Sequence, residues 1–285
     1  MRIGITSDIH TEISPANRKI VKHLADIVKH SQLDVFIICG DISSSPLEFS
    51  RTISAFQDIT CKKLLVAGNH DIWLAPKSGD ITSYRKYDLI TALCKEYDFH
   101  HLGDSATIVG KIGFCGTIGW YDYSFRSTEY EISDENYMSK TFGGSVWNDV
   151  NYAEWNAPDL EVAKGFEDDL QKQIDSIRDK VSRIIVATHH VPFRECVTYR
   201  SELPWDFFSA FMGSKGLGDI CLDEPLVSHV FFGHTHKEFF MEIERQDSRP
   251  QSSVLAVCSP VGYLTEPPAD LRNYAKRMIK IIELT

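Results

Sequence analysis

Five short polar clusters stand directly after apolar, strand-like runs along this chain of 285 residues. The clusters are Asp8-Ile9-His10, Gly40-Asp41, Gly68-Asn69-His70-Asp71, His189-His190 and Gly233-His234-Thr235-His236. A strand terminus fixes the backbone, while the loop that follows leaves a side chain open to a ligand. Imidazole, carboxylate and amide groups repeated at such places predict a site for two metal ions.

The first hundred residues alternate strand-like and helical patterns, which is typical of parallel strands joined by right-handed crossovers. Apolar runs predict strands over 3–9, 35–42 and 63–68, and helical spacing predicts helices over 15–28, 46–57 and 81–97. A longer helix is predicted over 160–181. A second sheet is predicted to begin near His101, with strands over 106–109, 111–117, 183–188, 229–232, 238–244, 253–258 and 278–284.

The length and the 43% content of hydrophobic residues suit one domain over residues 1–285. Two aromatic and acidic insertions interrupt it, at about 120–158 and 197–218. The density of Trp and Tyr in the first insertion argues against disorder, so we interpret it as an inserted loop or cap, with a partly ordered surface excursion as the alternative. We expect deletions within 120–158 to change substrate preference and to leave metal content intact.

The net charge of −10 argues against a surface that neutralises long nucleic acid, so a small substrate is the expected partner. The seven scattered cysteines indicate reduced, mostly buried thiols. Neither a charged-then-apolar leader nor a bilayer-length apolar stretch is visible, so no membrane association and a cytoplasmic location are expected. The pattern does not decide between a monomer and a homo-oligomer.

The candidate ligands offer nitrogen and oxygen but no sulfur. Mixed imidazole and carboxylate sets favour divalent ions such as Mn, Fe, Zn or Co over Mg and Ca. Asp8 and His10 lie two residues apart, so both can point to one side of an extended chain. Glycines precede Asp41, Asn69 and His234, where the absence of a Cβ permits a tight turn.

In this order the clusters resemble the signature of the calcineurin-like metallophosphoesterase superfamily. That signature is Asp-x-His, Gly-Asp, Gly-Asn-His-Asp or Gly-Asn-His-Glu, a single His, and Gly-His-x-His. The resemblance runs from Asp8 to His236. It implies an α/β fold, a four-layer α-β-β-α sandwich of two facing mixed sheets, with the dimetal site at the carboxyl-terminal ends of strands.

The resemblance also implies a ligand set for each of two divalent ions. One ion would be held by Asp8, His10 and His236, and the other by Asn69, His189 and His234. Asp41 would bridge the two ions, since a carboxylate has two oxygens to share. The resemblance permits either His189 or His190 as the ligand; we assign His189 because it directly ends the apolar strand, and the exchanged assignment stays open.

His70 would face the substrate as a proton donor to the leaving oxygen or as a stabiliser of the phosphoryl charge. Asp71 is predicted to orient His70 through its other ring nitrogen. The alternative is that His70 only braces the site.

Further substrate contacts are predicted from side chains near the clusters. His190 could contact the substrate, and Arg194 could anchor a phosphate, with an ordinary surface position as its equal alternative. Aromatic stacking on the substrate would come from the two insertions, with packing on the core as the alternative; the candidates are Trp120, Tyr121, Tyr123, Trp205 and Phe208.

The predicted function is dinuclear-metal hydrolysis of a small phosphoester, and we favour a phosphodiesterase because aromatic insertions suit a nucleotide-like diester. A phosphomonoesterase, such as a protein or nucleotide phosphatase, is the alternative enzyme. A non-catalytic metal-binding scaffold is the alternative of another class.

Overall fold

The first sheet carries the amino-terminal part of the chain in a computed structural model that describes residues 1–74, 81–245 and 253–284. Its strand order is β13-β1-β2-β3-β4. β1 to β4 run parallel, and β13 pairs antiparallel with β1. The bounds are β1 Arg2–Thr6, β2 Val35–Cys39, β3 Lys62–Val66, β4 Phe99–His101 and β13 Lys280–Glu283.

The second sheet has the order β11-β12-β10-β9-β6-β5. Its four central strands are parallel, and β5 and β11 close the two edges antiparallel to their neighbours. The bounds are β5 Thr107–Val109, β6 Ile112–Thr117, β9 Arg183–Thr188, β10 Val227–Phe232, β11 Phe239–Glu244 and β12 Ser253–Cys258.

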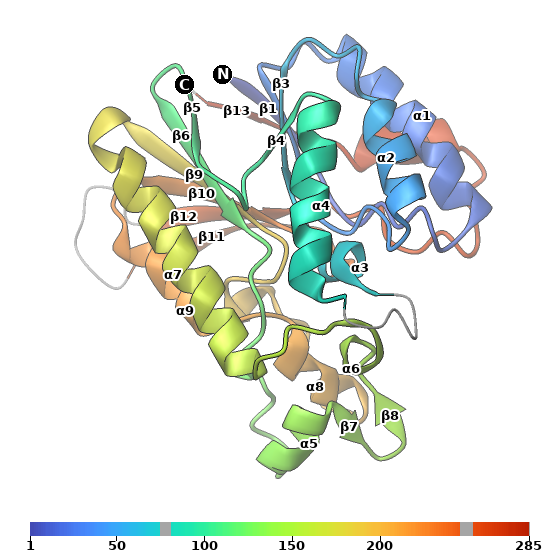
Figure 1. Cartoon of the computed structure of the whole chain (residues 1–285), viewed down its shortest axis with the longest axis vertical. Helices are drawn as coiled ribbons and strands as arrows, with labels where there is room; N and C mark the ends of the chain where they lie inside the picture. Colours follow the sequence, from blue (N-terminus) through green and yellow to red (C-terminus); the bar gives the residue numbers. More distant parts are fainter. Residues whose placement is uncertain (75–80, 246–252, 285) are drawn as a thin grey trace.

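Helices cover the outer faces of the two sheets and give the four-layer order that the resemblance implied (Figure 1). The first sheet is covered by α1 Pro15–His30, α2 Pro46–Ser54, α4 Ser83–Glu96 and α10 Leu271–Arg277. The second is covered by α7 Asp159–Ile177, which continues as η1 Arg178–Lys180, and by α9 Lys215–Asp223. The helix α3 Asn69–Ile72 follows β3 directly.

Alternating side chains of the central strands fill two different apolar layers. On β2, Val35, Ile37 and Cys39 face the layer between the sheets, whereas Phe36 and Ile38 face the helices. Strands that are buried on both faces read as continuous apolar runs, which is why periodicity showed them clearly.

The two insertions pack on each other and form one cap at the end of the sandwich (Figure 1). Tyr137 stacks on Phe207 with ring centroids 5.5 Å apart, and Trp147 stacks on Phe211 at 5.4 Å. The first insertion holds α5 Asp134–Ser139, β7 Thr141–Phe142, β8 Ser145–Val146 and α6 Asp149–Tyr152, and the second holds α8 Trp205–Phe208 and η3 Ser209–Phe211, just after η2 Arg194–Cys196.

The last strand differs from its prediction. We predicted that 278–284 belongs to the second sheet, but β13 pairs with β1 at the edge of the first, with Ile282 opposite Ile3. The amphipathic α10 packs beside α1 and returns the chain to that open edge. Within the described ranges, no helix is both long enough and apolar enough to cross a membrane.

The close approach of the two sheets can be tested at Gly116 on β6. A Cβ there would lie 2.7 Å from the Ala187 carbonyl oxygen and 2.8 Å from Val66 on β3. Gly116→Ala should therefore lower the free energy of unfolding by about 1–3 kcal/mol, measured by urea denaturation. The matched control is Gly165→Ala on α7, where a Cβ meets no atom within 4 Å; there a gain of roughly 0.5–1 kcal/mol is expected. Equal stability of the two variants would contradict the close packing.

Candidate metal centre

The predicted ligands come together because parallel strands of both sheets end at one edge of the sandwich. Asp8 follows β1 by two residues, Asp41 follows β2 by two, and Asn69 begins α3 after β3. From the second sheet, His189 follows β9 directly, and His234 follows β10 by two residues. Each strand fixes the loop that follows it. Clusters that are far apart in the sequence therefore place their side chains around one common point.

Several predicted ligands occupy left-handed backbone, which residues other than glycine rarely adopt. The φ angles are 53° at Asp8, 50° at His10, 55° at Asp41, 71° at His234 and 52° at His236. Such residues cost of order 1–3 kcal/mol each and cluster at functional sites. The backbone is therefore bent to aim these side chains at a common point.

Two of the glycines that precede ligands leave space for close contacts. A Cβ on Gly68 would lie 2.2 Å from Asp41 Oδ1, and a Cβ on Gly233 would lie 2.6 Å from the Cys39 carbonyl oxygen. At both positions the absence of a Cβ therefore permits the close approach of a neighbouring loop.

The first ligand group gathers around His10 Nε2. This atom lies 2.9 Å from His236 Nε2, 3.4 Å from Asp41 Oδ2 and 3.9 Å from Asp8 Oδ1. His236 Nε2 lies 3.5 Å from the same Asp8 oxygen. Four ligand atoms at such spacings can share one ion, since donors bound at about 2.1 Å stand roughly 3–3.5 Å apart.

The second ligand group gathers around His189 Nε2. This atom lies 3.1 Å from Asn69 Oδ1, 3.2 Å from His234 Nδ1 and 3.4 Å from Asp41 Oδ2. The three charged or imidazole members of the group are buried. The structure thus brings together both sets that the resemblance implied, and it brings His189 rather than His190 to the group.

Asp41 belongs to both groups through a single oxygen. Its Oδ2 is 3.4 Å from His10 Nε2 and 3.4 Å from His189 Nε2. Its Oδ1 accepts a hydrogen bond of 2.8 Å from the backbone N–H of His70. Asp41 Oδ2 is therefore the oxygen that both ligand groups would share, while Oδ1 is held by the backbone.

Hydrogen bonds fix which ring nitrogen each histidine presents. His189 Nδ1 donates to the Cys39 carbonyl at 2.9 Å, and His234 Nε2 donates to the Phe211 carbonyl at 3.2 Å. Partners of this kind orient metal-binding imidazoles and set their tautomer. The opposite nitrogens, His189 Nε2 and His234 Nδ1, are those that face the ligand group, so the residues fit a divalent ion.

Burial and charge act against each other on the ionisable groups. Burial would raise the pKa of Asp41, but the neighbouring imidazoles, His189 first, hold it well below its ordinary value. Burial would lower the pKa of His70, but the carboxylates of Asp41 and Glu12 raise it. For His190 burial dominates, aided by the charge of His189, and lowers the pKa to about 3. Charge therefore opposes burial at Asp41 and at His70, whereas at His190 both act in the same direction.

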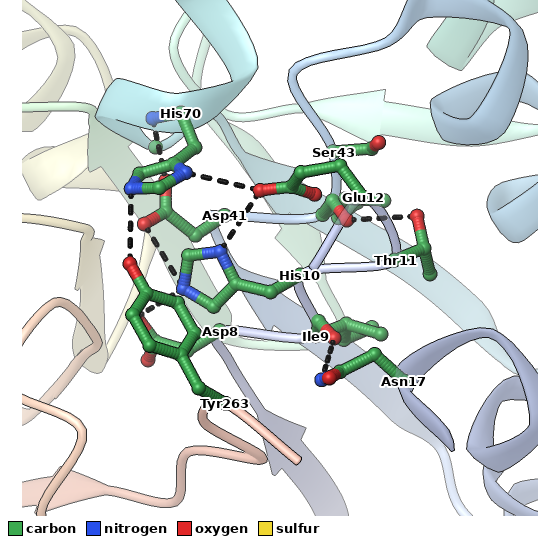
Figure 2. Close-up of polar contacts among 12 residues, drawn as sticks. Asp8, Ile9, His10, Thr11, Glu12, Asn17, Asp41, Ser43, His70 and Tyr263 are labelled. Atoms are coloured by element: carbon green, nitrogen blue, oxygen red, sulfur yellow. Dashed lines mark hydrogen bonds and ion pairs between the residues drawn. The ribbon is translucent and has the colours of Figure 1, made fainter. Parts of the chain in front are cut away.

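Glu12, which sequence reasoning missed, orients His70 (Figure 2). Its Oε1 lies 3.0 Å from His70 Nδ1 and 3.2 Å from His10 Nδ1, while Tyr263 Oη lies 3.3 Å from His70 Nε2. Glu12 follows His10 by two residues, the same spacing that separates Asp8 from His10. That repeat was the available signal, whereas nothing in the sequence pointed to Tyr263.

The prediction that Asp71 orients His70 is wrong. The Asp71 carboxylate accepts three backbone hydrogen bonds of 2.8 Å each, from the N–H groups of Ile42, Ser43 and Gly68. Both ring nitrogens of His70 meet other residues. Asp71 therefore holds together the loops after β2 and β3 instead of touching the candidate catalytic ring.

A cavity of about 610 Å³ opens above both ligand groups. Metal-centre residues on its wall include Asp41, Asn69, His70, His234 and His236. The cap supplies most of the remaining wall, with Val146, Trp147, Asn148, Val197, Thr198, Arg200, Trp205, Phe208, Ser209 and Met212. Of the aromatic residues predicted to line the site, Trp205 and Phe208 do so.

Five other predicted substrate contacts lie elsewhere. Among the residues that the structure describes, the cavity wall does not include Trp120, Tyr121, Tyr123, His190 or Arg194. The first two are buried in the core, and His190 is buried with its Nδ1 on the Ile118 carbonyl at 3.1 Å. Arg194 donates to the Ser124 and Arg126 carbonyls. For Trp120 and Tyr121, the alternative of packing on the core is therefore the one that the structure shows.

The family model for calcineurin-like phosphoesterases matches residues 1–238. This chain is a calcineurin-like phosphoesterase. It is therefore a hydrolase of a dimetal-dependent family that acts on phosphoester bonds. None of the curated proteins matches it.

Solved structures share the fold of this phosphoesterase at low sequence identity. Phosphopantetheinyl hydrolase from Mycobacterium tuberculosis is 16% identical, with a TM-score of 0.74 over 98% of this chain and 95% of that one. A dimetal phosphatase from Danio rerio is 14% identical, with a TM-score of 0.54 over 94% and 89% of the two chains. A purple acid phosphatase from yellow lupin is 13% identical, with a TM-score of 0.50 over 94% of this chain and 46% of that one.

The two ligand groups predict the metal content of variants. Metal-stripped phosphoesterase should take up two Mn²⁺ ions per chain, counted by mass spectrometry after dialysis. His236→Ala should lose one ion, and Asp41→Ala should weaken both because its Oδ2 belongs to both groups. The control, His229→Ala on β10, should keep two ions. Full retention of both ions by Asp41→Ala would contradict the shared oxygen.

Proposed function

We propose that this phosphoesterase is a dinuclear-metal phosphodiesterase that acts on a small substrate with a bulky, largely apolar arm. The cavity above the metal centre carries this proposal. Its volume of about 610 Å³ falls in the range of sites that enclose a whole small molecule, and far exceeds one phosphate group. A diester has two arms, and the cavity has room for one of them beside the reacting phosphorus.

The lining of the cavity matches an anionic substrate with such an arm. Trp73, Trp147 and Phe208 give it apolar faces. Among the described lining residues, Asp41 of the metal centre is the only carboxylate, while Arg200 and Lys237 supply positive charge. In a chain of net charge −10 this local excess of cations favours an anion at the cavity.

Each group at the centre has a role in ester hydrolysis. Asp8, His10 and His236 would hold one ion, and Asn69, His189 and His234 the other, with Asp41 shared between them. Two such ions, when bound, supply Lewis acidity at phosphorus and activate water near neutral pH. The chain itself must then orient the ester and protonate the leaving group.

His70 would protonate the leaving oxygen from Nε2, while Glu12 holds the ring through Nδ1. Water adds its oxygen to phosphorus and releases one proton, the P–O ester bond breaks, and the departing alkoxide takes the His70 proton. The proton released by water then replaces the one that His70 gave up. The products are an alcohol and a phosphomonoester. A carboxylate on the far nitrogen keeps the ring both aimed and basic enough to regain its proton.

We further propose Mn²⁺, Fe²⁺, Zn²⁺ or Co²⁺ as the ions, because the donors are nitrogen and oxygen alone. The seven cysteines are all free thiols, which supports a reducing, cytoplasmic setting. Phosphopantetheinyl esters belong among the trial substrates, since a phosphopantetheinyl hydrolase has this fold.

The substrate preference can be tested with a pair of chromogenic esters. With Mn²⁺ restored to metal-stripped protein, bis-p-nitrophenyl phosphate should be hydrolysed with a higher kcat/KM than p-nitrophenyl phosphate. His70→Ala should lower turnover by about 10²–10⁴-fold for a diester with an alkoxide leaving group. The loss should be smaller for p-nitrophenyl esters, because p-nitrophenolate departs without a proton.

His23→Ala on α1, outside the centre, serves as the control and should retain full activity. Higher turnover of the monoester would instead support a phosphatase. Stoichiometric binding of two ions with no turnover of either ester, with Mn, Fe, Co or Zn, would favour the scaffold alternative.

A further inference from the structure

A buried carboxylate from the cap contacts the metal centre. Asp149 stands at the start of α6 in the first insertion, and only 1% of its surface is exposed. Its Oδ1 accepts hydrogen bonds from Asn69 Nδ2 at 2.9 Å and from Trp73 Nε1 at 2.6 Å. Its Oδ2 accepts one from Trp147 Nε1 at 2.7 Å. One carboxylate thus receives three N–H donors.

The contact with Asn69 decides which end of this amide faces the centre. An amide has a donor end and an acceptor end, and only the oxygen can bind a metal ion. Asp149 accepts from Nδ2, and this leaves Oδ1 turned toward His189 Nε2 at 3.1 Å. Without an acceptor at this position, rotation about the terminal side-chain bond could present the NH2 group to the ion instead.

The two tryptophans connect Asp149 to the cavity above the metal centre. Both indoles line the cavity, and Trp73 stacks on the His70 ring with centroids 3.6 Å apart. The N–H of each indole is bound to the buried Asp149 carboxylate, and this hydrogen bond fixes the orientation of the ring. Asp149 therefore supports a predicted ligand and two side chains of the cavity wall. Through Trp73 it also supports the ring of His70.

We propose that Asp149 is a positioning residue of the metal centre, which holds the amide oxygen of Asn69 toward the ion and the Trp73 and Trp147 rings on the cavity wall. The proposal rests on the proposed function, in which Asn69 is a ligand. It replaces our expectation that changes within 120–158 leave metal content intact. The cap is then part of the metal site as well as its cover.

The chain offers a matched control in Asp159, another largely buried carboxylate at the cap. Asp159 accepts from Trp120 Nε1 at 2.8 Å and also binds Lys140 and Tyr123. Its described contacts are with cap and core residues and with none of the ligands. Variants of either aspartate therefore lose a hydrogen bond from an indole. Only variants of Asp149 also lose the contact with the amide of Asn69.

The test is calorimetric titration of metal-stripped full-length protein with Mn²⁺. Asp149→Ala should weaken one of the two ions by roughly 10- to 100-fold, because removal of such an outer partner costs that much in metal affinity. The other ion should bind as in the wild type. Asp159→Ala should leave both affinities unchanged.

A double-mutant cycle separates positioning from general loosening of the cap. Added to Asn69→Ala, the Asp149→Ala change should produce no further loss of affinity, because its effect through the amide is already gone. Three results would overturn the proposal: unchanged affinity for both ions in a folded Asp149→Ala variant, equal weakening of both ions, or additive losses in the cycle. Wild-type protein that binds two ions and hydrolyses no ester contradicts the proposed hydrolysis alone.

Discussion

One carboxylate oxygen, Asp41 Oδ2, joins the two halves of the candidate metal centre. It lies 3.4 Å from a ligand nitrogen of each group, one nitrogen after β1 and the other after β9. Its place is set by the turn after β2, where Asp8 N–H donates to the Gly40 carbonyl and His10 N–H donates to that of Asp41. The space left by Gly68 completes the fit. The two sheets must therefore meet at this turn for the centre to form.

The sandwich meets that requirement through its core. Apolar side chains such as Ile37, Val66 and Phe231 fill the layer between the sheets and bring their carboxyl-terminal edges together. That burial offsets the left-handed backbone at the ligands, since apolar burial contributes about 25 cal/mol per Å² over the whole domain. The cap adds a second layer of control. Phe211 accepts from His234, and Asp149 accepts from Asn69, so both insertions touch ligands as well as the cavity.

Much of this arrangement could be predicted from the sequence. Strands buried on both faces appear as unbroken apolar runs, and the polar clusters mark their ends, so the parallel strands and the place of the site were predictable from the residues. The division of the ligands into two sets came from the family resemblance. The left-handed turns were not, because a residue such as His236 carries no mark of its φ angle. The pairing of β13 with β1 was not predicted for a related reason. The sheet that an edge strand joins depends on long-range packing, here that of α10 beside α1.

Side-chain partners were predicted least well. Asp71 is adjacent to His70 in sequence, yet on α3 the two side chains diverge, and Glu12 reaches the ring from another loop. From the sequence, Trp120 and Tyr121 were candidates for stacking on the substrate, but both side chains are buried in the core. Asp149 belongs to no motif. Each of these cases depends on contacts between distant segments, which neither periodicity nor spacing records.

Electron paramagnetic resonance of protein loaded with two Mn²⁺ ions per chain tests the shared oxygen most directly. Ions bridged by Asp41 Oδ2 would stand about 3.5–4 Å apart and should give an exchange-coupled spectrum. His236→Ala, loaded with one ion, should give the six-line signal of isolated Mn²⁺. Two isolated six-line signals from fully loaded wild-type protein would contradict a single centre built around Asp41.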